Sequence, residues 1–203
     1  MFKGNPTVTQ HLGDLAGFTL IELMVVLAVA AILVGLALPG LQSLVAANQL
    51  TSVTDSFATA LNAARSEAGK LGVPVALTTS GGVNWGSGWT MFVDTNGNGV
   101  QDVANTTPPL ETTLRKAGAL PPGYTLNSTA AFSGLISFDS TGRLYPAGVP
   151  TAEFMVCQNG SLTSGGGARL ITVATSGRVR IVQPDSSGNL MNDSNVAVTS
   201  CSP

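Results

Sequence analysis

Charged, aromatic and histidine side chains are scarce in this chain. Of its 203 residues, 10% are Asp, Glu, Lys or Arg, 5% are aromatic, and histidine occurs once, as His11. Ordinary soluble domains carry about 25% charged residues, so part of the chain is shielded from water or very sparsely charged. One histidine and two cysteines, Cys157 and Cys201, exclude most zinc sites and most histidine-dependent catalysis.

An excess of positive charge is also lacking. The formal net charge is −2 and the isoelectric point is near 5.2. These values exclude a generally basic nucleic-acid-binding protein, so any contact with nucleic acid needs a local patch. The length suits one domain, or one domain with an appendage.

The most pronounced feature that is present is a long apolar run near the N-terminus. Residues 1–17 are polar, and the following 21 residues, from Phe18 to Leu38, are almost all apolar. About 20 apolar residues in a helix are enough to cross a bilayer. A secretory signal peptide or a plain membrane anchor also has such a run. A signal peptide is cleaved after its apolar run, however, whereas the small residues at 16–17 precede this one.

One acidic residue, Glu22, lies near the start of this run. An ionised carboxylate is costly there unless it is paired. Cleavage after Gly17 would give Phe18 a positive α-amino group four residues away. The two charges could then pair within one chain or between neighbouring chains.

The segment from Gly17 to Glu22, GFTLIE, resembles the type IV prepilin motif. The resemblance implies a leader, residues 1–17, that a prepilin peptidase removes, followed by N-methylation of Phe18. It also implies that Glu22 sets the register with a neighbouring subunit. Residues 18–39 are then the transmembrane or filament-core part of a helix.

Helical periodicity continues beyond Pro39 and then gives way to β-like runs. Apolar residues recur at steps of three and four up to Leu71, and Gly72 and Pro74 end the pattern, so residues 40–72 are the amphipathic second half of the helix. These patterns predict one long N-terminal helix followed by a β-rich head, residues 73–203, and the resemblance implies an α+β, type IV pilin-like fold in which the helix packs on antiparallel strands of the head. Strands are expected at Val73–Thr79, Trp89–Asp94, Leu110–Lys116, Ala131–Phe138, Glu153–Cys157, Arg169–Ala174 and Arg178–Val182.

Several short motifs in the head narrow the resemblance to the GspH/FimT family of minor pilins and pseudopilins. In chain order they are Ala64–Ala68 (ARSEA), Gly88–Asp94 with Asn96–Gly99, Phe138–Arg143, and Gly177–Arg180 (GRVR). The tail, residues 183–203, matches no motif of the family.

An Asn- and Gly-rich segment resembles the first part of a calcium-binding loop. Its candidate ligands are Asp94, Asn96, Asn98 and Asp102. The twelfth position of such a loop should be Glu but is Asn105, and no helix precedes the segment. Asn-Gly pairs also form tight turns. We therefore favour a structural turn over a metal site and expect no cofactor.

The resemblance to pilins also bears on the two cysteines. A pilin head is exported to an oxidising compartment, where a lone pair of cysteines normally forms a disulfide. We expect Cys157 and Cys201 to be joined, tying the tail to a core strand. A redox-active pair is the alternative, but it lacks the C-x-x-C spacing.

The GRVR segment predicts an arginine-bearing hairpin. A three-residue loop at residues 175–177, with Gly177 in the left-handed conformation, pairs Ala174 with Arg178. Arg178 and Arg180 then share one face, about 7 Å apart, which is close to the spacing of phosphates along a nucleic-acid strand. In this register Arg169 falls on the opposite face of the sheet.

In the FimT branch of the family, a GRxR turn is associated with DNA binding during natural transformation. The resemblance implies Gly177, Arg178 and Arg180, with Arg169 as a further candidate, as DNA-binding residues. The alternative is that the arginines only keep a hairpin tip soluble, since a Gly-Arg turn also occurs in relatives dedicated to secretion. The sequence leaves open whether the tail, residues 183–203, covers the arginine face, where Asp185 and Asp193 could neutralise Arg178 and Arg180.

The resemblance to this family implies a minor type IV pilin, held in the bacterial inner membrane by one helix with its head in the periplasm. Its expected partners are other pilins, the prepilin peptidase and, through weak non-specific contacts, DNA. The alternative is an H-type minor pseudopilin of a type II secretion system with no role in DNA uptake. An enzyme is not expected, because the chain without its leader has no histidine and no recognisable nucleophile–base pair.

Overall fold

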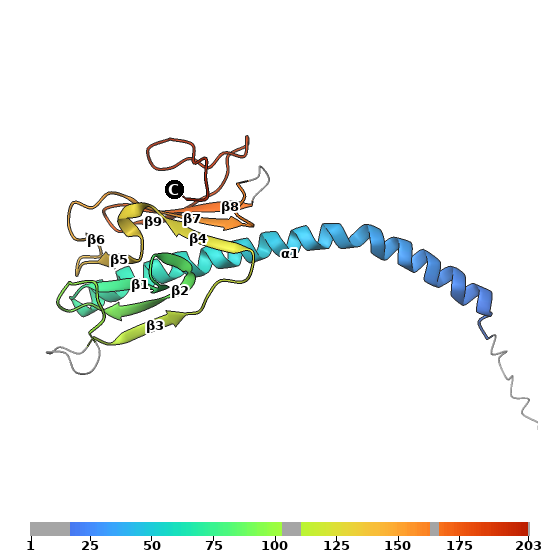
Figure 1. Cartoon of the computed structure of the whole chain (residues 1–203), viewed down its shortest axis with the longest axis horizontal. Coiled ribbons are helices and arrows are strands. Elements are labelled where there is room, and N and C mark those ends of the chain that lie inside the picture. Colours follow the sequence, from blue (N-terminus) through green and yellow to red (C-terminus); the bar gives the residue numbers. More distant parts are fainter. Residues whose placement is uncertain (1–16, 103–110, 163–166, 203) are drawn as a thin grey trace, which may run out of the picture. The chain divides into compact units, whose positions relative to one another are not determined.

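A computed structural model of the chain describes residues 17–102, 111–162 and 167–202. The expected leader, apart from Gly17, lies outside these residues. The chain divides into two compact units, residues 1–43 and 44–203. One helix, α1 (Leu20–Leu71), contributes to both units, and each unit is described below by itself (Figure 1).

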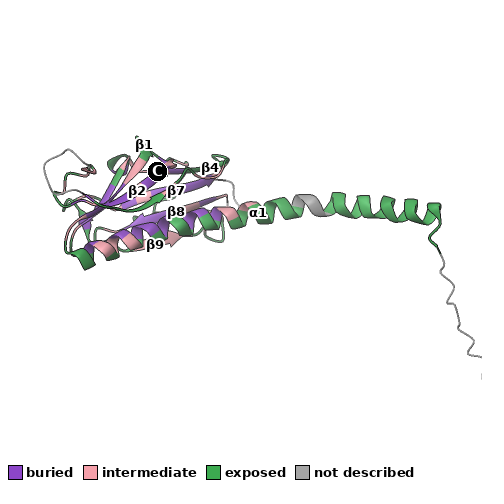
Figure 2. Ribbon diagram, turned by 90° about the horizontal axis from the view of Figure 1, so that it is seen from below, coloured by how far each residue is buried: buried purple, intermediate pink, exposed green. Residues whose placement is uncertain are grey.

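The first unit consists, in its described part, of the start of α1. Thr19 precedes the helix, and its hydroxyl accepts a hydrogen bond from the N–H of Glu22 at 3.3 Å, as expected of an N-cap residue. The apolar side chains that follow are exposed, and Figure 2 colours this stretch green. Within the described residues, α1 is the one helix that is long and apolar enough to cross a membrane, with a mean hydropathy of 2.8 over 18 residues.

The second unit begins with the remainder of α1, which buries one stripe against the β-sheets. Residues on this stripe include Leu50, Phe57, Leu61 and Ala64. The helix ends as expected at Leu71, and the N–H of Gly72 donates to the carbonyl of Ala68 at 3.0 Å. The expected apolar spacing therefore faces the sheets between Leu50 and Ala68, whereas Leu44, Val45 and Leu71 are exposed.

Two antiparallel sheets make up most of the second unit. The strand order is β3-β2-β1-β5-β6 in the first sheet and β4-β7-β8-β9 in the second. The strands of the first sheet are β1 (Val75–Gly81), β2 (Asn84–Val93), β3 (Thr113–Ala117), β5 (Leu135–Phe138) and β6 (Leu144–Tyr145). Those of the second sheet are β4 (Tyr124–Ser128), β7 (Ala152–Gln158), β8 (Ala168–Val173) and β9 (Val179–Val182).

An aromatic cluster joins α1 to both sheets. Phe57 of α1 lies 5.4 Å from Trp85 of β2 and 5.0 Å from Phe154 of β7, measured between ring centroids. All three rings meet edge to face and are fully or almost fully buried, which is the favoured geometry for aromatic pairs. The helix and two sheets therefore share one core, and the expected α+β fold is confirmed.

Some of the expected strands differ from those observed. The single strand expected over Ala131–Phe138 is wrong in its first half, where residues Ala130–Phe132 form a 3-10 helix, η1, before β5. Strands β4 and β6 were not expected. The strand expected at Trp89–Asp94 is the second half of β2, which begins at Asn84.

Candidate functional site

The expected hairpin between β8 and β9 is present with the expected register. The N–H of Gly177 donates to the carbonyl of Ala174 at 2.7 Å, and the N–H of Ala174 donates to the carbonyl of Arg178 at 3.0 Å. Gly177 has a φ of +78°, in the left-handed region. Val179 pairs with Val173, and Arg180 pairs with Thr172.

This register separates the hairpin's apolar and basic side chains onto opposite faces. Val179 and Ile181 pack against the core cluster under α1. Arg178 and Arg180, at alternate positions, share the other face, and both are exposed. The two arginines of the GRVR segment are therefore close enough to act together.

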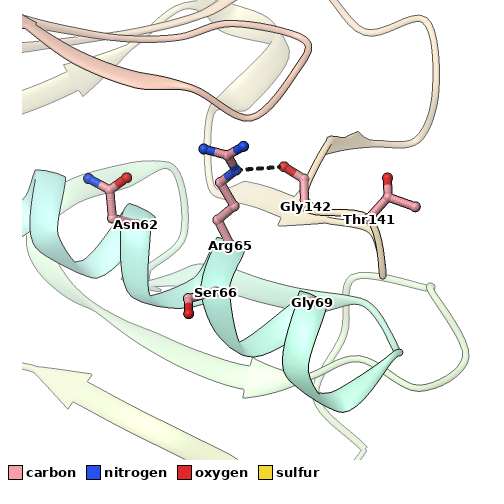
Figure 3. A pocket seen from close by; sticks show the side chains of 6 residues that line it. All are labelled: Asn62, Arg65, Ser66, Gly69, Thr141 and Gly142. Atoms are coloured by element: carbon pink, nitrogen blue, oxygen red, sulfur yellow. Dashed lines mark hydrogen bonds between the residues drawn. The ribbon is translucent and has the colours of Figure 1, made fainter.

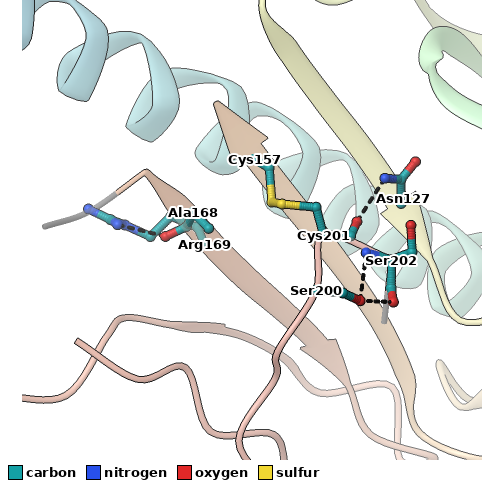
Figure 4. Close-up of a disulfide and its surroundings, with 7 residues drawn as sticks. All are labelled: Asn127, Cys157, Ala168, Arg169, Ser200, Cys201 and Ser202. Atoms are coloured by element: carbon teal, nitrogen blue, oxygen red, sulfur yellow. Dashed lines mark hydrogen bonds between the residues drawn. A yellow bond between two sulfur atoms is a disulfide. The ribbon is translucent and has the colours of Figure 1, made fainter. Parts of the chain in front are cut away.

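Arg169 lies apart from this pair. Arg169, in β8, pairs with Val156 of β7. Val156 belongs to the buried core that α1 shares with the sheets, so Arg169 lies on the helix-facing side of its sheet. Its guanidinium donates to the carbonyl of Ala168 at 2.8 Å (Figure 4). The structure thus does not bring Arg169 together with Arg178 and Arg180.

The hairpin is held in place by a contact that the sequence did not indicate. A methyl group added at Gly177 would lie 1.8 Å from the carbonyl oxygen of Gly142. The same oxygen accepts a hydrogen bond from Nε of Arg65 at 3.1 Å (Figure 3). The ARSEA segment of α1 and the two Gly-Arg turns therefore meet at one point.

Asp139 organises the first of these Gly-Arg turns. Its Oδ1 atom accepts hydrogen bonds from the N–H groups of Thr141 and Arg143, at 2.8 and 3.0 Å. Burial by itself would raise the pKa of Asp139, but these hydrogen bonds, that of the Thr141 hydroxyl and the charge of Arg143 together lower it. The ionised carboxylate thus stabilises the turn on which Gly177 packs.

An open pocket of about 250 Å³ lies beside this junction. Its lining is polar or small and contains no acidic side chain: Asn62, Arg65, Ser66, Gly69, Thr141 and Gly142 (Figure 3). Arg65 thus lies near the GRVR hairpin, and so does Arg143, which lines a neighbouring pocket together with Thr175. The sequence indicated neither position. Only their place in the three-dimensional fold identifies them, because they are far apart in the sequence.

The C-terminal tail reaches the arginine face. Asp193 forms an ion pair with Arg180, and it also accepts a hydrogen bond from the hydroxyl of Thr172 at 3.3 Å. Within the described residues no ion pair involves Arg178. The tail therefore pairs with one arginine of the two and, within the described residues, leaves the other without an ion pair.

The expected disulfide is present and anchors the tail. Cys157 of β7 is joined to Cys201, 44 residues later (Figure 4). Cys157 is fully buried, and the side chain of Asn127 in β4 donates to the carbonyl of Cys201 at 2.7 Å. The tail thus lies on the face of the second sheet opposite α1.

The calcium-like segment is built as a hydrogen-bonded turn. Both carboxylate oxygens of Asp94 accept backbone N–H groups, from Asn98 and Gly99, each at 3.0 Å. Asn96 donates to Asp102 at 2.7 Å, and Asn105 lies outside the described residues. Burial raises the pKa of Asp94 although these N–H groups oppose the effect. Because its oxygens are already occupied by donors, Asp94 serves as the turn's acceptor.

The comparisons with known proteins agree with this architecture. A family model described as type II transport protein GspH matches residues 53–177, and a model of the prokaryotic N-terminal methylation motif matches residues 16–38. No curated protein matches the chain.

Among solved structures, the type IV minor pilin FimU of Pseudomonas aeruginosa is similar in two crystal forms, with 22% identity in each. The TM-scores are 0.54 and 0.52, and the matches cover 76% and 74% of this chain and 96% and 98% of that one. The minor pseudopilin EpsH from the Type 2 Secretion System of Vibrio cholerae matches with 15% identity, a TM-score of 0.43, and coverage of 66% of this chain and 96% of that one.

Proposed function

This chain belongs to the family of type II transport protein GspH, and we propose that it is a minor pilin whose head binds DNA during DNA uptake. Family membership and the methylation motif make it a minor pilin or pseudopilin that assembles with other subunits of this kind. Such proteins are structural subunits, which confirms the expectation that the chain is not an enzyme.

Assembly begins, in this proposal, at the methylation motif. The prepilin peptidase removes residues 1–17, and Phe18 becomes the N-methylated first residue of the mature chain. The exposed apolar part of α1 anchors the subunit in the inner membrane, with the head in the periplasm. Glu22 then pairs with the amino group of Phe18 in a neighbouring subunit and sets the register of the filament.

The observation that supports DNA binding is the exposed arginine face of the β8–β9 hairpin. Arg178 and Arg180 occur at alternate positions and are turned away from the core, at a spacing that suits successive phosphates. Two or three phosphate contacts give weak, salt-sensitive binding without sequence preference. Several subunits in one filament would supply the avidity that a single head lacks.

The test is DNA binding by the full chain in a nonionic detergent, followed by fluorescence anisotropy across a salt series. We expect the affinity to fall with salt at a log–log slope of about 1–2, which is about 0.9 for each arginine that contacts a phosphate, and the Arg178→Gln/Arg180→Gln variant to lose most of the binding. The matched control is Arg115→Gln/Lys116→Gln, which removes the same charge from β3 in the other sheet. If the wild type does not bind at low salt, or both variants weaken binding equally, the proposal fails.

A second candidate function is that of an H-type minor pseudopilin of a type II secretion system. The description of the matching family model favours it, and so does the ion pair that occupies Arg180. In this case the head contacts other pseudopilins, and the Arg178→Gln/Arg180→Gln variant co-purifies with them as the wild type does. Retained assembly together with absent DNA binding would support this candidate over the first.

A further inference from the structure

We propose that Asp193 acts as an internal competitor for the DNA phosphates, occupying Arg180 so that Arg178 is the arginine of the pair first available to a polyanion. This inference rests on the proposed DNA-binding function and adds a regulating residue to its site. It goes beyond the GRVR hairpin because Asp193 belongs to the C-terminal tail, residues 183–203.

The first support is a row of side chains that crosses three strands of the second sheet. Glu153 of β7 pairs with Thr172 of β8, and Thr172 pairs with Arg180 of β9. Paired residues of neighbouring strands project from the same face. Asp193 contacts two members of this row, because it accepts from the hydroxyl of Thr172 and forms an ion pair with Arg180.

The second support is that the tail is fixed on both sides of Asp193. On one side, Leu190 is buried in an apolar cluster with Met155 and Leu170 on the tail-facing side of the sheet. On the other side, Cys201 is joined covalently to Cys157. A carboxylate held between two anchors stays near its partner at little further cost in conformational entropy.

The third support is the local turn that presents Asp193. The side-chain oxygen of Asn192 accepts hydrogen bonds from the N–H groups of Ser194 and Val196, at 3.1 and 2.9 Å. Such a turn fixes the direction of the backbone at residue 193. The position of the carboxylate is therefore built into the tail and does not depend on the ion pair alone.

The fourth support is a second negative charge, that of Glu153, which also disfavours a polyanion at Arg180. Glu153 lies in the row that ends at Arg180, and the charge of Asp193 is close enough to affect its ionisation. A phosphate approaching Arg180 therefore meets two carboxylates and one guanidinium. Arg178 is not part of this row. It lies two residues before Arg180, at the hairpin loop, and is exposed. We infer that binding begins at Arg178 and reaches Arg180 only when Asp193 is displaced.

The test compares wild type and Asp193→Asn as full chains in nonionic detergent, with a fluorescent DNA duplex as the probe. Loss of the ion pair makes Arg180 available, so we expect about fivefold tighter binding at low salt. The log–log salt slope should also steepen by about 0.7–0.9, the increment for one further phosphate contact. Asp193→Ser, which also shortens the side chain, is a second variant and should change binding in the same direction.

The control is Asp185→Asn, which changes the net charge equally within the same tail. Asp185 accepts hydrogen bonds from the N–H groups of Ser187 and Asn189, at 2.8 and 2.9 Å, and its side chain makes no ion pair within the described residues. If Asp185→Asn strengthens binding as much as Asp193→Asn, general charge explains the effect and the competitor is refuted.

The outcomes separate this inference from the function on which it rests. Tighter binding by Asp193→Asn than by a wild type that binds supports both. Equal binding by the two refutes the competitor and leaves DNA binding intact. Binding by Asp193→Asn alone supports the competitor and refutes DNA binding by the native chain, and binding by neither refutes both.

Discussion

Gly177→Ala tests the packing that fixes the arginine hairpin. Gly177 has a φ of +78°, and an added methyl group would lie 1.8 Å from the carbonyl oxygen of Gly142. The obstacle is backbone, so it cannot rotate away as a side chain can. Either the hairpin or the turn at Gly142 must move.

The expected loss of stability has two parts. Holding a non-glycine residue in the left-handed conformation costs about 1–2 kcal/mol. Displacing the carbonyl of Gly142 breaks its 3.1 Å hydrogen bond with Arg65, and a hydrogen bond to a charged group contributes about 1.5–3 kcal/mol. We therefore expect Gly177→Ala to lower the free energy of unfolding by about 2.5–5 kcal/mol.

The matched control is Gly82→Ala. Gly82 has nearly the same φ, +76°, but a methyl group there meets nothing within 4 Å. This variant should lose only the conformational part, about 1–2 kcal/mol. Chemical denaturation of the full chain in nonionic detergent, followed by the fluorescence of the buried Trp85 and Trp89, measures both. If Gly177→Ala costs no more than Gly82→Ala, the reasoning about the Gly142 contact is wrong.

Three further predictions concern the acidic residues and the disulfide. Burial and the charge of Asp193 raise the pKa of Glu153, so its unfavourable ionisation lowers stability as pH rises through that pKa. Glu153→Gln should therefore raise Tm near pH 7 but not near pH 3.5, and equal Tm changes at both would contradict this. Reducing the disulfide should lower the free energy of unfolding by about 4 kcal/mol on the chain-entropy model for its 44-residue separation. Urea midpoints with and without reductant measure this, and coincident midpoints would rule it out. Asp94→Ala should cost about 1–3 kcal/mol, because it leaves the N–H of Gly99 without its acceptor and removes one of the two acceptors of the Asn98 N–H, while calorimetric titration of wild type with millimolar calcium should give no heat. Binding heat would restore the metal site.

Local patterns predicted the elements that carry strong periodicity or turn chemistry. The end of α1 followed from its apolar spacing and from Gly72 and Pro74. The register of the β8–β9 hairpin followed from a three-residue loop ending in glycine. In both cases the physical cause lies within a few neighbouring residues, which is why the sequence was sufficient.

Weakly patterned strands could not be predicted in this way. β4 has one fully buried residue, Leu126, and follows two prolines and a glycine, so its sequence is typical of a loop. β6 has only two residues. The first half of β2 contains Gly86 and Gly88, which are unfavourable in strands. Pairing with neighbouring strands stabilises all three, and that information is not local.

The contacts that define the candidate site are also long-range. Arg65 and Gly142 are 77 residues apart in sequence, and no periodicity relates them. The sequence offered Asp185 and Asp193 as possible neutralising charges, and only the folded tail identifies Asp193 as the residue that pairs with Arg180. Residue types therefore indicated the chemistry of the face, and tertiary packing determined which arginine forms an ion pair with the tail.

The central claim is that the arginine face serves DNA uptake. Its most direct test is to replace the native gene with the Arg178→Gln/Arg180→Gln variant in the bacterium that encodes it, and to measure natural transformation and protein secretion side by side. The account predicts that transformation is lost while secretion is unchanged. Normal transformation combined with impaired secretion would contradict it and identify the chain as a secretion pseudopilin.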